Sequence, residues 1–433
     1  MKKTLTALAL TVFALRLCSA ESVTTWTGEA GDGNFYTPGN WDKGAPGRTT
    51  TVRFVSDACL TASGSPTVSE GYGGKWKLEE GVQVYFAKES LHYIGNSGTV
   101  VVDVAKDALL VVSNGFSGYN PAIFRKEGEG TLRLHGKLNS NNNNGKGWHT
   151  FDVVGGRMEF VLLPSASVGT DITNIVVRSG AELCYRGKPS WHSDKIALCL
   201  ERGSTLRLVD FGNNNKIAAL SGEGEIVAEG DTASHICCEM TKPCDNPFTG
   251  SLSGNLVLEY CASIEKHPSV QLFPDAEIRL SGVEEEVISV PVKGEGTLAV
   301  HNGKKTFGSF YPENCKKLVH YSPIELSGGE GTIGTVCAGK KNALCTISGG
   351  RFTGGESLGT TGQGHLGTPD GINTTASITF GHLEVTGGEF AWAGGNGVSE
   401  FRMRGGRTWF MKSNAFALDT LQWVFDGGEA VID

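Results

Sequence analysis

The chain has 433 residues, a formal net charge of −8 and 61 glycines, about twice the usual proportion of glycine. The excess of acidic residues argues against a protein that binds nucleic acid through a basic face. A chain of this length also exceeds one compact core, so we expect either several domains or a fold that grows in one dimension.

Residues 1–20 have the pattern of a secretory signal peptide. Two lysines precede an apolar stretch over residues 5–15, and Cys18-Ser19-Ala20 is typical of a cleavage site. Leu17 stands where a lipoprotein signal usually carries a small residue, so we expect cleavage after Ala20 rather than lipidation. The mature chain is therefore expected to be exported, to the extracellular space or the outer cell surface. No later stretch is apolar enough to predict a transmembrane helix.

Residues 21–57 contain the stretch "TWTGEAGDGNFYTPGNWDKGAPG", which is rich in tryptophan and glycine. Exposed aromatic rings in such a loop would suit a sugar ligand. The alternative is a cap, because the first coil of a repeat stack needs its core face covered. We favour the cap and expect Trp26, Phe35 and Trp41 to close that coil, with both tryptophans buried and near each other.

Residues 58–330 contain ten short runs in which apolar and polar residues alternate, which indicates strands with one buried face. In "GTLRLHG" this alternation predicts that Leu132 and Leu134 point inward. The first inward apolar residues of the ten runs lie 20 to 30 positions apart: Val82, Leu109, Leu132, Met158, Leu183, Leu206, Ile226, Leu256, Ile278 and Leu298. This spacing predicts an all-β fold, a right-handed parallel β-helix with about 20–25 residues per coil. An array of β-sandwich domains remains the alternative.

Residues 331–433 continue the periodic spacing with a different motif, a glycine pair followed by a short aromatic or apolar run that we expect to be a strand. The pairs begin at Gly349, Gly387, Gly405 and Gly427, and the first interval is long enough to hide two units. We expect a second stretch of β-solenoid here. Because no polar cap follows the last repeat, we expect this region to be truncated at its C-terminus.

Ten of the eleven cysteines remain after cleavage at Ala20, and export permits disulfides between them. In a solenoid, residues one coil apart in the sequence lie one above another. Two cysteine pairs have about this separation, so we hypothesise inter-coil disulfides between Cys315 and Cys337 and between Cys238 and Cys261. Buried free thiols that fill small core positions are an equal alternative.

The spellings "GEGTLRLHG" and "GEGTLAVHNG" resemble the autotransporter-associated β-strand repeat. The opening stretch is similar to an N-terminal element found ahead of such repeats, with Phe35 where a tryptophan is common. The matching residues are Trp26, Gly28, Asn40, Trp41, Gly44, Pro46 and Gly47. The resemblance implies a β-helical, passenger-like domain at the surface of a Gram-negative bacterium or released from it. Ten cysteines depart from the family pattern, since passengers are typically poor in cysteine.

No stretch predicts a catalytic, cofactor-binding or metal-binding residue. The acidic triplet Glu284–Glu286 is typical of a solvated loop, and "GQGHLG" at 362–367 lacks the strand and helix that a dinucleotide site needs. Trp148-His149 and Trp191-His192 pair an aromatic ring with a base, but surface positions at coil corners explain them more simply.

These features favour a structural or adhesive protein, an adhesin-like rod, over an enzyme. A carbohydrate-binding or polysaccharide-degrading β-helix is one alternative. The other is an autotransporter passenger whose barrel is not part of this chain, so that its outer-membrane anchor is separate or missing. Expected partners are extracellular polysaccharide or a host or matrix surface. We expect no nucleic acid and no cofactor.

Overall fold

The computed structural model of the chain contains two compact units, one over residues 1–151 and 156–158 and the other over residues 152–155 and 159–433. The expected signal peptide, Cys315, Trp191-His192 and the "GQGHLG" stretch lie outside the described residues. The structure describes residues 22–47, 50–61, 75–86, 98–113, 116–118, 122–135, 138–140, 148–161, 172–187, 195–212, 215–242, 248–261, 270–282, 286–288, 293–294, 296–307, 317–332, 336–338, 344–354, 382–392, 400–410 and 422–432.

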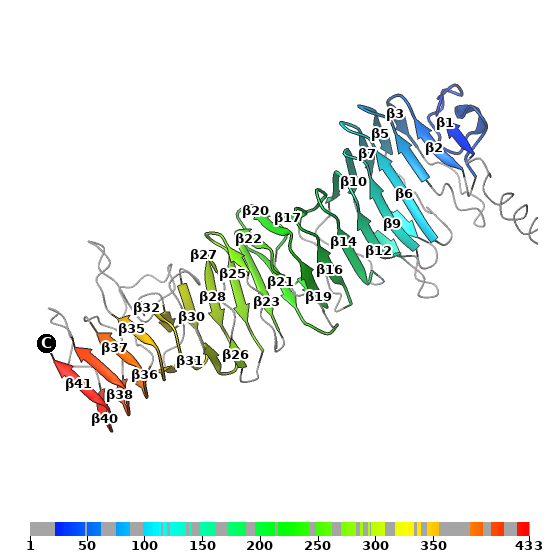
Figure 1. Ribbon diagram of the computed structural model, residues 1–433. Coiled ribbons are helices and arrows are strands. Elements are labelled where there is room, and N and C mark those ends of the chain that lie inside the picture. The colour runs from blue at the N-terminus through cyan, green and yellow to red at the C-terminus, as the bar shows by residue number, and fades with distance from the viewer. Residues whose placement is uncertain are drawn as a thin grey trace, which may run out of the picture. The chain divides into compact units, whose positions relative to one another are not determined.

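The first unit is a parallel β-solenoid in which successive coils add strands to the same sheets (Figure 1). One sheet contains, in order, β1 (Val23–Thr25), β2 (Thr51–Phe54), β4 (Lys75–Leu78), β6 (Gly98–Val104) and β9 (Ala122–Glu127). The other contains β3 (Ala58–Leu60), β5 (Gln83–Phe86), β7 (Leu109–Val112) and β10 (Thr131–His135). A short pair, β8 (Phe116–Gly118) and β11 (Leu138–Ser140), and a 3₁₀ turn, η1 (Pro38–Asn40), complete the unit. Two strands, β12 (Trp148–Val153) and β13 (Arg157–Val161), carry residues of both units.

Alternation of side chains builds the core of the first unit. Leu132 and Leu134 are buried, as predicted, and Leu132 lies in register with Leu110 of the preceding coil. The expectation that Leu109 points inward is wrong. Leu109 pairs with Gln83 on the outer face, because the β7 strand "LLVV" is apolar at consecutive positions and its alternation is hidden. A one-residue shift moves every side chain of a strand to the other face.

The second unit is also a parallel β-solenoid and contains strands of five sheets. Its first sheet contains β14 (Asn174–Val177), β16 (Ala197–Leu200) and β19 (Ala219–Gly222). Its second contains β15 (Glu182–Arg186), β17 (Thr205–Val209), β20 (Glu225–Glu229), β22 (Ser251–Gly254), β24 (Gln271–Leu272) and β27 (Lys293–Gly294). Its third contains β18 (Asn215–Ile217), β21 (Ser234–Cys238), β23 (Leu256–Tyr260), β25 (Glu277–Leu280), β28 (Thr297–Val300), β30 (Lys317–His320) and β33 (Val336–Ala338).

The last two sheets form the C-terminal part of the second unit. The fourth contains β26 (Glu286–Ile288), β29 (Lys305–Phe307), β31 (Ile324–Leu326), β34 (Leu344–Ile347), β36 (His382–Val385), β38 (Glu400–Met403) and β40 (Gln422–Phe425). The fifth contains β32 (Glu330–Thr332), β35 (Arg351–Gly354), β37 (Glu389–Trp392), β39 (Arg407–Phe410) and β41 (Glu429–Ile432). Old sheets end as new ones begin. In chain order, β18 opens the third sheet just before β19 closes the first. Likewise, β26 opens the fourth sheet just before β27 closes the second, and β32 opens the fifth just before β33 closes the third.

Parallel pairing settles the choice of fold class. Every strand pair described in the two units is parallel, whereas β-sandwiches of the expected kind are built from antiparallel strands. The β-solenoid is therefore confirmed and the β-sandwich alternative is wrong. The long interval between Gly349 and Gly387 contains one coil rather than two, since β35 pairs directly with β37 across it.

Stacked glycine corners explain the recurring glycine pairs. A Cβ atom at Gly387 would lie 2.3 Å from the backbone oxygen of Ser348 in the coil below, and the same clash arises at Gly349 and Gly405. Each corner therefore packs backbone on backbone and has no room for a side chain. Each pair is followed directly by a strand of the fifth sheet, so the corner fixes where that strand begins.

Candidate functional site

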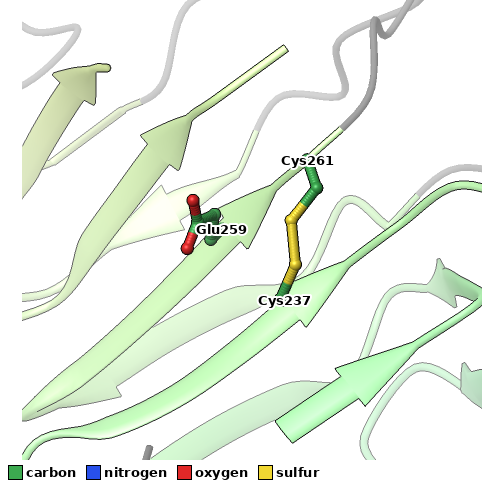
Figure 2. Close-up of side chains that lie close together, drawn as sticks. All are labelled: Cys237, Glu259 and Cys261. Atoms are coloured by element: carbon green, nitrogen blue, oxygen red, sulfur yellow. A yellow bond between two sulfur atoms is a disulfide. The ribbon is translucent and has the colours of Figure 1, made fainter. Parts of the chain in front are cut away.

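The only disulfide that the described residues contain joins Cys237 to Cys261 on the outer face of the third sheet (Figure 2). The two cysteines come from neighbouring strands, β21 and the end of β23, and their Cα atoms are 6.4 Å apart. Cys237 is in register with Glu259, which lies two residues before Cys261 and therefore on the same face. The structure thus brings two sulfurs and one carboxylate together on the outer face of the sheet, with Cys237 buried and Glu259 and Cys261 half-buried.

Two polar neighbours hold Glu259 in this cluster. The Nε2 atom of His235 is 2.7 Å from one carboxylate oxygen of Glu259, and Ser281 of the next coil donates its hydroxyl to the other. The close polar contact with His235 is the largest cause that lowers the pKa of Glu259 to about 2, and the hydrogen bond from Ser281 also lowers it, against the opposing effect of burial. The Glu259 carboxylate is therefore anionic at neutral pH, and its orientation is fixed.

The expected disulfide between Cys238 and Cys261 is wrong by one residue. Cys238 is in register with Tyr260, which shows that the coils here repeat every 22 residues. Cys261 therefore points outward, while Cys238 points inward as a buried thiol. The alternative of a core thiol fits Cys238, and the inter-coil disulfide is formed by the neighbouring Cys237 with Cys261. Sequence spacing gave the correct coil but not the correct face.

The second expected pair is only partly described. Cys337 lies on β33 in register with Val319 of β30, one position before the end of the strand pair. Its proposed partner Cys315 is outside the described residues. The disulfide between them remains a prediction.

The three N-terminal aromatic residues lie together in the core at the start of the first unit. Trp26 and Trp41 are 6 % and 4 % exposed, and their ring centroids are 5.1 Å apart. Phe35 is fully buried and stacks on Trp76 of β4 at 5.3 Å. None of the three rings therefore offers an exposed surface for stacking on a sugar.

Asn40 organises the loop that carries these rings. Its side chain accepts a hydrogen bond from the backbone of Ala30 and donates to Asp32 and to the backbone oxygen of Asn34. Trp41 donates its indole N–H to the backbone oxygen of Phe35 at 2.8 Å. Buried polar groups in the loop are thus satisfied within it, which fixes the rings against the first coils.

Ion pairs between successive coils cover the outer faces of the second unit. Arg178 bridges Asp152 and Glu201 at 2.8 and 2.7 Å. Arg207 likewise pairs with Glu182 and Glu229, on the coils before and after it. These carboxylates are each held by arginine, an arrangement that suits a brace between coils better than proton transfer to a substrate.

A charge ladder runs along the fifth sheet at the first position of its strands. Arg351, Glu389, Arg407 and Glu429 are in register, so positive and negative residues alternate from coil to coil. Arg351 lies 2.7 Å from Glu389, and Arg407 lies 2.6 Å from Glu429.

The remaining sequence candidates contribute no assembled site among the residues that the structure describes. His149 is half-buried on β12, and Glu286 begins β26, while Glu284 and Glu285 fall outside the described ranges. No helix in the described ranges has the length and apolarity that crossing a membrane requires. The sequence did not indicate that Cys237, Glu259 and Cys261 lie on one face of the third sheet. This arrangement depends on a local coil length of 22 residues. Comparison of the chain with protein-family models, with curated proteins and with solved structures gave no match.

Proposed function

We propose that this chain is an exported structural protein, at the surface of a bacterial cell or released from it, whose solenoid has a scaffolding or adhesive role. The observation that carries the proposal is the bracing of the outer faces. Arginine–carboxylate bridges and one disulfide join successive coils, and the charged groups that they use are neutralised by each other rather than gathered around a cavity.

Export is supported by two independent features. Residues 1–20 have the pattern of a cleavable leader. The Cys237–Cys261 disulfide belongs to the chemistry of oxidising compartments outside the cytoplasm. The repeat spelling supports a finer proposal, that the solenoid is built from repeats of the autotransporter-associated type and is carried outward as a passenger.

Expression of the full chain with its leader in a Gram-negative host tests this proposal. We expect the leader to be removed after Ala20, the disulfide to form, and the chain to become accessible to protease added to intact cells or to appear in the medium. A matched chain without residues 2–20 should stay in the cytoplasm with its thiols reduced. A full-length chain that keeps its leader and remains protected in the cytoplasm contradicts the proposal.

The adhesive role needs a separate measurement. The mature chain, coupled to beads, should adhere to surfaces coated with polysaccharide or matrix protein more strongly than beads that carry an unrelated acidic protein. Cleavage of soluble polysaccharide by the purified chain would instead support the enzyme alternative. Beads with no adhesion above the control would limit the proposal to scaffolding.

A further inference from the structure

We propose that reduction of the Cys237–Cys261 disulfide creates a binding site for a thiophilic divalent cation such as Zn²⁺, with the two thiolates and the Glu259 carboxylate as ligands. The ligand atoms of these three residues all lie within 4.8 Å of one another, on one face of two neighbouring strands (Figure 2). The inference goes beyond the scaffolding role and does not depend on it.

The geometry fits a tetrahedral ion. Zn–S and Zn–O bonds of about 2.3 and 2.0–2.2 Å place ligand atoms of one tetrahedron roughly 3.5 Å apart. Breaking the S–S bond frees both sulfurs to rotate about their Cα–Cβ bonds. The sulfurs can then move apart to this spacing, and the distances from them to the Glu259 carboxylate, now within 4.8 Å, need to shorten by about 1 Å at most. Cys261 and Glu259 are only half-buried, which leaves the fourth position to solvent.

Neighbouring groups already orient the carboxylate for this role. His235 holds one oxygen of Glu259 at 2.7 Å, and Ser281 holds the other. A ligand carboxylate that is fixed by such outer contacts loses less entropy when it binds an ion. We therefore assign His235 as a positioning residue and Glu259 as a ligand.

Redox state and cation binding exclude each other. A dithiol reductant supplies two electrons and two protons, its own sulfurs become a disulfide, and the Cys237–Cys261 bond becomes two thiols. The cation then displaces the two thiol protons, which pass to solvent, and binds both thiolates. An oxidant that takes the two electrons back restores the S–S bond and releases the cation. One pair of sulfurs thus serves either as a covalent link between coils or as a cation site.

Co²⁺ is a suitable probe, because thiolate ligation gives it a charge-transfer band in the near ultraviolet. The full chain is reduced with a dithiol, freed of reductant without air, and titrated with Co²⁺ and then with Zn²⁺. We expect a thiolate–Co²⁺ band in the reduced chain that Zn²⁺ removes, and no such band in the oxidised chain. A reduced chain without the band, or an oxidised chain with it, overturns the proposal.

Variants separate this site from the other thiols. In the double variant Cys237→Ser/Cys261→Ser all other cysteines remain, and we expect the band to vanish. Cys59→Ser, which removes an exposed free thiol, should leave it unchanged. Glu259→Gln should weaken Zn²⁺ binding at least tenfold, and His235→Gln should weaken it less while the band keeps its position. A band that persists in the double variant, or an affinity that Glu259→Gln does not alter, overturns the assignment, and an unchanged far-ultraviolet circular dichroism spectrum shows that each variant is folded.

Discussion

A buried histidine shows how one side chain in a solenoid core governs stability. His320 points inward from β30, in register with Val300 and Ala338, and is 1 % exposed. Its Nδ1 atom is 3.2 Å from the backbone oxygen of Ser322, and Nε2 has no hydrogen-bond partner among the described residues. Burial lowers the pKa of His320 to about 4, against the opposing effect of the Ser322 contact.

This pKa predicts acid sensitivity in the third sheet. The unfolded chain takes up the His320 proton below about pH 6.5, while the folded chain takes it up only near pH 4, so stability falls as the pH drops through this window. The loss should be on the order of 2 kcal/mol. His320→Leu should reduce the loss between pH 7 and pH 4.5, measured by urea unfolding. Equal slopes for the two chains would contradict the predicted linkage, and similar stability at pH 7.5 serves as the control.

A glycine corner gives a second prediction at the scale of one residue. Gly387→Ala places a Cβ atom 2.3 Å from the Ser348 backbone oxygen, which cannot move without disturbing the coil below. We expect a loss of about 2–3 kcal/mol in the free energy of unfolding. Gly47→Ala is the matched control, because its Cβ would meet only the Thr50 hydroxyl at 3.6 Å. Equal effects of the two substitutions in denaturant unfolding would refute the role of the stacked corner.

At the scale of the strand, the charge ladder of the fifth sheet places oppositely charged side chains next to each other on neighbouring strands. Each cation of the ladder has an anion in the next coil. If a strand paired with the strand two coils away instead of its neighbour, like charges such as Arg351 and Arg407 would meet. Exposed pairs contribute little free energy individually. Their alternation therefore acts mainly on register.

Reversal of one rung tests the ladder. Glu389→Lys stacks three cations in a row and should cost about 1 kcal/mol at low salt, whereas Glu389→Gln removes the attraction without adding repulsion and should cost less. The difference between the two variants should shrink in about 1 M salt, where such charges are screened. Thermal unfolding at both salt concentrations measures it, and a difference that salt does not change would rule out an electrostatic origin.

The disulfide acts between two neighbouring strands. Cys237 and Cys261 are separated by 24 residues, and a link across a loop of this length stabilises a fold by about 3 kcal/mol through the unfolded chain. Cys261→Ser should lower the free energy of unfolding by about that amount under oxidising conditions and have little effect under reducing conditions. Cys59→Ser, which removes an exposed free thiol, should be neutral in both. A deficit of the same size under reduction would show that the bond is not the cause.

At the scale of the whole molecule, each coil contacts mainly its neighbours, so stability is a sum of local terms. A defect at one corner should therefore remain local. Gly387→Ala should increase hydrogen exchange in β34–β41 while β2–β10 of the first unit keep their protection, as measured by mass spectrometry of peptides. Uniform loss of protection through both units would show that the chain unfolds as a single cooperative block instead.

Sequence alone predicted much of this fold, since two-residue alternation and regular spacing are enough to indicate stacked strands. It assigned Leu132, Leu134 and most of the other first apolar residues of the ten alternating runs to the core. It did not reveal that Leu256 belongs to a different sheet from Ile226, whose partner is Leu252, because every strand of a solenoid has the same local pattern. Pairing is decided by three-dimensional stacking over coils of unequal length.

The same reason limits the prediction of the site. A cysteine pair can be placed on adjacent coils by spacing, but a change of one residue in coil length exchanges inner and outer faces. Cys238 and Cys237 could not be distinguished without the register of β21 with β23. The ladder charges were equally hidden, because one coil of their stack is 38 residues long.

The replacement of one sheet by the next limits how far a surface pattern on the third or fourth sheet of the second unit can extend. The third and fourth sheets of the second unit have seven strands each and the fifth has five. Six spacings of about 4.8 Å give a continuous face roughly 29 Å long before a new face takes over. A linear polymer that bound at one point per coil would therefore find matching points only over that length. Avidity along this surface would saturate after a few repeats of the polymer, and longer chains would have to turn onto another face or engage a second molecule.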